Sequence, residues 1–133
     1  MMQTTYGFGT SLKLPYDEAV QRVKDALQTE GFGVLSEIDV RKTMREKLGV
    51  EMEPYIILGA CNPPLAHRAL QVDPSIGLLL PCNVVVRQTG DGTVVETIDP
   101  MMMVSVSDNP ALQPVADEAA SRLRKTLAAL PTS

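Results

Sequence analysis

The chain has little of what several common function classes require. It has no tryptophan, only five other aromatic residues, one histidine and two cysteines among 133 residues. Binding to a phosphate backbone needs clustered lysine and arginine, whereas this chain has a formal net charge of −4. No apolar run approaches the roughly 20 residues that span a bilayer. We therefore expect neither a nucleic-acid partner nor a membrane partner.

Residues 1–10 lack the charged and apolar regions of a signal peptide, so we expect a cytoplasmic protein. Two cysteines in a cytosolic chain are more often reduced thiols than a structural disulfide. No Cys-x-x-Cys spacing is present, and Cys61, Cys82 and His67 are only weak metal-ligand candidates, because structural zinc takes four ligands. With 44% hydrophobic and 21% charged residues, the composition indicates one globular domain over residues 1–133.

Hydrophobic periodicity predicts alternating strands and helices. Apolar alternation or continuous apolar runs predict strands at 6–14, 33–40, 55–60, 78–87 and 93–98. Helical spacing, with proline or asparagine at the start of several segments, predicts helices at 15–31, 42–48, 64–72 and 110–130. A hairpin turn is expected at 89–92, and residues 99–106 should be irregular or hold a short strand.

This order predicts an α+β two-layer sandwich with a mostly antiparallel sheet, many β-α-β connections and two long helices on one face. The other face then needs a cover. The apolar density of residues 55–60 and 78–86 favours a homodimer in which a second copy covers that face.

Residues 59–83 hold both cysteines and the only histidine. Cys61 is expected where a strand meets a helix N-terminus, and the N–H groups and dipole there stabilise a thiolate. Cys82 follows Pro81 in the next strand, so the two sulfur atoms meet if the strands are neighbours. The alternative is that both cysteines are small buried hydrophobes. His67 lies six residues beyond Cys61. It is a candidate base or ligand beside Cys61, and the alternative is a surface side chain of the helix.

Two other groups of residues are candidates. Glu37 and Asp39 share one strand face, and paired carboxylates can do acid–base work if one of them is buried. Glu37 is the better candidate for a site residue, because Leu35 flanks it on that face and an apolar neighbour suits a carboxylate to this work. The alternative is a solvated sheet face. The thioethers of residues 101–103 suit Cu(I) together with cysteine thiolates, although methionine more often fills gaps in a core. Asn62 is expected to cap a helix.

Residues 30–40, 42–50, 55–70, 76–86 and 96–103 resemble the bacterial and archaeal family catalogued as domain of unknown function 302, and the resemblance covers roughly residues 6–130. It implies a small α+β sandwich of β-α-β type that forms a dimer, and it implies no activity. The recurring motif of the family falls on Phe32, Glu37, Cys61, Asn62, Pro63, Leu80, Pro81 and Cys82.

Three functions fit these residues. The first is a dimeric binding module that holds a small ligand or a partner in a pocket lined by Cys61, Asn62, Cys82 and Glu37. The second is a thiol-dependent redox or soft-metal (copper) protein, or an enzyme, that uses Cys61 with Cys82. The third is a structural dimerisation domain without a site. Apart from the copper alternative, the sequence predicts no cofactor.

Overall fold

The computed structural model describes residues 2–90 and 92–132. Its strands form one six-stranded sheet in the order β1-β2-β6-β5-β4-β3, and each neighbouring pair is antiparallel. The strands are β1 (Met2–Gln3), β2 (Gly7–Leu12), β3 (Gly33–Asp39), β4 (Tyr55–Cys61), β5 (Cys82–Thr89) and β6 (Gly92–Ile98). The α-helices are α1 (Tyr16–Thr29), α2 (Val40–Leu48), α3 (Pro63–Val72), α4 (Met102–Ser107) and α5 (Gln113–Ala128), and the 3-10 helices are η1 (Pro74–Leu79) and η2 (Pro110–Leu112).

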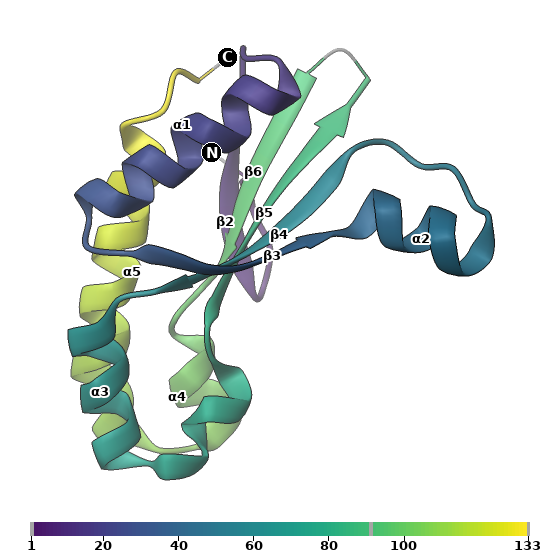
Figure 1. Cartoon of the computed structure of the whole chain (residues 1–133). Coiled ribbons are helices and arrows are strands. Elements are labelled where there is room, and N and C mark those ends of the chain that lie inside the picture. The colour runs from purple at the N-terminus through teal and green to yellow at the C-terminus, as the bar shows by residue number, and fades with distance from the viewer. Residues whose placement is uncertain (1, 91, 133) are drawn as a thin grey trace.

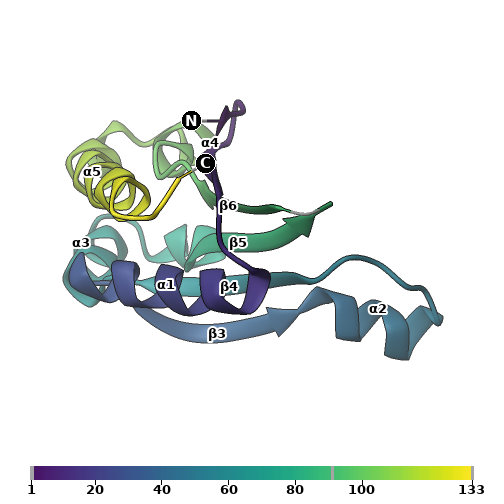
Figure 2. The same ribbon diagram turned by 90° about the horizontal axis from the view of Figure 1, so that it is seen from above.

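The two long helices, α1 and α5, pack against one face of the sheet (Figure 1, Figure 2). Burial of apolar side chains stabilises this layer, and the sequence supplies them at helical spacing in α1 and α5 and at alternate positions in the strands. The predicted α+β sandwich, with an antiparallel sheet and two long helices on one face, is confirmed. The buried core includes Ala19, Val23, Leu27, Leu58, Val84, Val86, Val95, Leu123 and Leu127.

A second, smaller core lies at the end of the sheet where β4 stops and β5 starts. There α3, η1, α4 and η2 pack beside α5, below the sheet in Figure 1. Its buried side chains are Leu65, Ala69, Ile76, Met103, Leu112, Val115, Ala116 and Ala119. This second core positions the candidate site, because its helices surround the space beyond the ends of β4 and β5.

Two predicted elements are wrong in position or type. The strand expected at 78–87 begins only at Cys82, because Pro74 starts η1 and the Asp73 carboxylate accepts a hydrogen bond from the Ser75 N–H at 3.0 Å. Residues 102–107 form helix α4 rather than an irregular segment or strand. The carbonyl and carboxylate of Asp99 accept hydrogen bonds from Met102 and Met101 and close the turn that leads into α4.

The predicted face assignment of β3 is also wrong, because β3 contains a bulge at Leu35. Val34 pairs with Ala60 and Ser36 with Gly59, so Leu35 is an extra residue in the strand. After one inserted residue the alternation reverses. Val34 and Glu37 therefore share the face covered by helices.

Helix α2 extends away from the rest of the chain and buries no residue (Figure 1). Asp39 caps its N-terminus by accepting the Lys42 N–H at 2.9 Å, and Gly49 ends it with a φ of 66°, which glycine adopts without strain. The predicted hairpin joins β5 to β6, with Thr89 opposite Gly92, while Asp91 of that turn lies outside the described residues. Within residues 2–90 and 92–132, no helix is long and apolar enough to cross a membrane.

Candidate functional site

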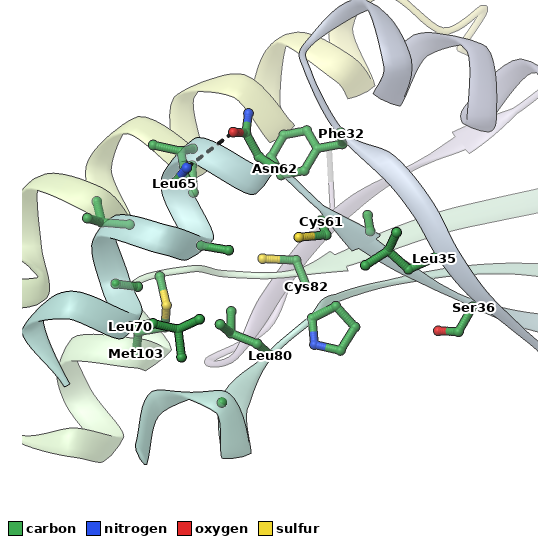
Figure 3. Close-up of a pocket in the computed structure, with 17 residues that line it drawn as sticks. Phe32, Leu35, Ser36, Cys61, Asn62, Leu65, Leu70, Leu80, Cys82 and Met103 are labelled. Carbon is green, nitrogen blue, oxygen red and sulfur yellow. Dashed lines mark hydrogen bonds between the residues drawn. The ribbon is translucent and has the colours of Figure 1, made fainter. Parts of the chain in front are cut away.

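A pocket of about 400 Å³ opens where β4 ends and β5 begins (Figure 3). Its walls come from β3, from the ends of β4 and β5, and from α3, α4 and α5. Among the residues that the structure describes, the polar lining side chains are those of Ser36, Asn62 and the two cysteines, Cys61 and Cys82. The remaining lining residues are Phe32, Leu35, Ala60, Leu65, Ala66, Ala69, Leu70, Gly77, Leu80, Pro81, Met103, Val115 and Ala119. Within residues 2–90 and 92–132, no charged side chain lines the pocket.

Asn62 fixes the direction in which α3 leaves the sheet. It is the N-cap of α3, and its Oδ1 accepts a hydrogen bond from the Leu65 N–H at 3.3 Å. Its Nδ2 donates to the carbonyl oxygen of Glu30 at 3.5 Å. The predicted cap is confirmed, and both ends of the Asn62 amide are already bonded to the protein. Asn62 therefore shapes the pocket more than it offers a free polar group to a ligand.

The first turn of α3 does not provide the thiolate donors that the sequence suggested for Cys61. Pro63 and Pro64 have no N–H group, and both stand in that first turn. The next two N–H groups are used within the turn, since Leu65 donates to the Asn62 side chain and Ala66 to the Asn62 carbonyl. The expectation that helix N–H groups stabilise a Cys61 thiolate is therefore wrong.

The two cysteines nevertheless lie side by side. Pairing of β4 with β5 sets Ala60 opposite Cys82, so Cys61 is one residue beyond that pair, and Figure 3 shows the two sulfur atoms on the same side of the pocket. Both thiols are free; Cys82 is buried and Cys61 is partly exposed. Burial, and to a lesser degree the charge of Cys61, raises the pKa of Cys82 to about 11. Cys82 is therefore a neutral thiol at physiological pH.

Two predicted site residues are not brought to the pocket. Glu37 lies on the helix-covered side of β3, where its carboxylate pairs with the Lys24 ammonium of α1 at 2.9 Å. The bulge at Leu35 is the physical reason, because it places Glu37 on the other face from the one that its spacing indicated. His67 is exposed on α3 and is not among the lining residues. The structure thus brings Cys61, Asn62 and Cys82 together and separates Glu37 and His67 from them.

Most of the pocket was missed by the sequence reasoning. Its volume is left free by small side chains, Ala66 and Ala69 on α3 and Ala119 on α5. Their helical spacing on apolar faces was the available signal, but it does not show which helices face each other. Met103, from α4, adds a third sulfur to the lining. In the described part of the chain, no three His, Cys, Asp or Glu side chains form a group that could hold a metal ion.

The fold and the pocket together define a small α+β domain with one antiparallel sheet and an apolar pocket at the end of that sheet. The chain belongs to the family described as domain of unknown function DUF302, whose model matches residues 8–130. It is similar to the crystal structure of an uncharacterized conserved DUF302 protein from Bacillus stearothermophilus. The two chains are 32% identical over 94% of this chain and 98% of the other, with a TM-score of 0.87. A comparison with curated proteins gives no match.

Proposed function

We propose that the protein is a binding module whose pocket takes an uncharged, apolar small molecule. The observation that carries this proposal is a pocket of about 400 Å³ with no charged side chain in its lining. Pockets for small molecules start at about 300 Å³ and are lined mainly by apolar side chains. A charged organic ligand would lose its hydration there without meeting a charged side chain of opposite sign, which is costly.

The rim of the pocket supports the same class of ligand. Leu35, the bulge residue of β3, is 72% exposed, and Leu70 of α3 is 39% exposed, yet both line the pocket. Exposed apolar side chains beside an apolar cavity favour an apolar ligand or the apolar part of a larger one. Ser36 supplies a hydroxyl that can orient it.

A neutral fluorescent probe, N-phenyl-1-naphthylamine, tests this proposal. We expect saturable binding to the native protein, with an emission increase as the probe leaves water. Ala66→Phe fills the pocket from α3 and should lower the affinity more than tenfold, because the added ring occupies volume that the probe needs. His67→Phe adds the same side chain at the next, exposed position of α3 and should leave the affinity unchanged.

Glu37→Gln should also leave probe binding unchanged, because Glu37 faces Lys24 and not the pocket. Absence of saturable binding by the native chain would overturn the proposal. Equal effects of Ala66→Phe and His67→Phe would also overturn it, since they would place the probe elsewhere on the surface.

The adjacency of Cys61 and Cys82 favours a second candidate function, a thiol redox protein. In this function hydrogen peroxide takes two electrons and two protons from the two thiols, leaving a disulfide and two water molecules. Mass spectrometry of the native protein after mild peroxide treatment should then show the loss of two hydrogens and a Cys61–Cys82 cross-linked peptide. Two unmodified thiols after that treatment would contradict this candidate.

A further inference from the structure

Three sulfur atoms from separate elements line the same pocket. Cys61 ends β4, Cys82 starts β5 and Met103 lies in the first turn of α4, and all three side chains are drawn at the pocket in Figure 3. The two cysteines are the only ones in the chain, whereas Met103 is the one methionine among residues 2–90 and 92–132 that lines the pocket. We propose that this sulfur cluster binds one Cu(I) ion, with the two cysteines as ligands and Met103 as a third, thioether donor.

The chemistry of the lining selects this ion. Thiolate and thioether sulfur are soft donors, and thioether in particular favours Cu(I) over hard cations, which prefer carboxylate and carbonyl oxygen. In the part of the chain that the structure describes, no Asp, Glu or His side chain lines the pocket. Structural zinc takes four ligands in a tetrahedron, and the pocket supplies only two thiols. Cu(I) needs no such set, since two or three sulfur atoms suffice.

Binding of Cu(I) to the two thiols releases protons. One Cu(I) ion replaces the protons of both thiols, so two protons are released and the bis-thiolate complex carries one negative charge. No change of oxidation state is involved. Cys61 is partly exposed, so solvent reaches part of this charge, whereas Cys82 is buried among the apolar lining residues.

This inference uses the pocket of the proposed function but does not depend on that function, because copper binding and probe binding are measured separately. Cys61→Ser and Cys82→Ser keep nearly the size of the side chain and should lose Cu(I). Glu37→Gln, outside the pocket lining, should keep both Cu(I) and probe binding. A native chain that binds Cu(I) but does not bind the probe would overturn the apolar-ligand proposal alone.

The test is a titration of the full, reduced chain with Cu(I) under anaerobic conditions in competition with bicinchoninate. We expect one Cu(I) per chain, with near-ultraviolet absorption from sulfur-to-copper charge transfer. Each serine variant should bind more than about 100-fold more weakly, beyond what loss of an outer-shell partner costs. Met103→Leu should weaken binding, and Met102→Leu, the neighbouring position outside the pocket lining, should not.

Failure of the native chain to retain Cu(I) against the chelator would overturn the inference. Retention by the Cys61→Ser/Cys82→Ser double variant would overturn it equally, because the ion would then be bound elsewhere. Equal Cu(I) affinities of the Met103→Leu and Met102→Leu variants would show that the Met103 thioether is not a ligand. Circular dichroism and urea unfolding show that each variant is folded, so a loss of copper is assigned to the site.

Discussion

The side-chain nitrogen of Asn62 lies 3.5 Å from the carbonyl oxygen of Glu30 and joins the end of α1 to the start of α3. The same carbonyl accepts a second hydrogen bond from the Arg122 guanidinium of α5 at 3.2 Å. Three helices therefore meet at one backbone oxygen beside the pocket. The other end of the Asn62 amide caps α3 through the Leu65 N–H.

Replacing Asn62 should separate these two roles. We expect Asn62→Ala to lower the free energy of unfolding by about 1–2 kcal/mol, because it removes the helix cap and one donor to Glu30. Asn62→Ser keeps a capping oxygen for the Leu65 N–H and loses the amide donor to Glu30, so its effect should be smaller. Urea unfolding followed by circular dichroism measures both. An alanine variant as stable as the native chain would contradict this account.

Gly59 is a position where added volume would meet two neighbouring side chains. It lies opposite Ser36 across β3 and β4, and a Cβ there would press against the Ser36 hydroxyl and lie 2.9 Å from Cγ of Pro81. We expect Gly59→Ala to cost about 1–3 kcal/mol of stability, as overpacking does. Thermal unfolding of the purified variant measures this loss.

Gly33 provides the matched control for that substitution. It lies in the neighbouring strand β3, and a Cβ there meets no atom within 4 Å. Gly33→Ala should therefore be neutral or raise stability by a few tenths to about 1 kcal/mol, since alanine has fewer unfolded conformations than glycine. Equal losses in the two variants would show that the strand backbone, and not the contact with Ser36 and Pro81, sets the cost.

Local signals predicted the elements well, and contacts between distant segments could not be predicted in the same way. The Asn62-Pro63 and Asn109-Pro110 pairs mark helix starts because the cap and the missing N–H act within one turn, and both are found in the structure. The bulge at Leu35 reverses the faces of the following residues, and nothing in the alternation of β3 marks it. It alone removes Glu37 from the predicted site.

The pocket shows the same limit. Cys61, Asn62 and Cys82 are predicted to line one pocket, with the two sulfur atoms meeting if their strands are neighbours, and the structure brings the three residues together. The volume beside them depends on how α3 packs against α5, where Ala66 and Ala119, far apart in the chain, leave space. The predicted helix donors for Cys61 failed for a reason visible in the sequence, because Pro63 and Pro64 carry no N–H.

The two thiols should differ in reactivity with a neutral alkylating agent. Cys82 is buried and its pKa is raised to about 11, so at pH 8 only about one Cys82 thiol in a thousand is ionised. Since the thiolate is the nucleophile, iodoacetamide should modify the partly exposed Cys61 of the native protein and leave Cys82 unmodified. Peptide mass spectrometry identifies the modified site.

In 6 M guanidinium chloride both cysteines should react at similar rates, because unfolding removes the burial that raises the pKa of Cys82. Raising the pH toward that pKa should increase the reaction of Cys82 in the native state. Modification of Cys82 before Cys61 at pH 8 would show that Cys82 is more accessible than its burial indicates.

The sheet face opposite α1 and α5 is where the predicted second copy of the chain should bind. Ile38, Ile57 and Val85 stand side by side on that face, across β3, β4 and β5, and Ile38 is 50% exposed. A second copy would bury this row, and apolar area removed from water stabilises association. Sedimentation of the native chain at about 100 µM should then give twice the chain mass of 14.4 kDa.

Introduction of a charge by Ile57→Glu should give single chains, because an unpaired carboxylate in the interface is costly to bury. Gln21→Glu, the same change of charge on an exposed position of α1, should leave the dimer intact. A native chain that sediments as single copies would contradict the predicted dimer, and with it the interpretation of the protein as a structural dimerisation domain.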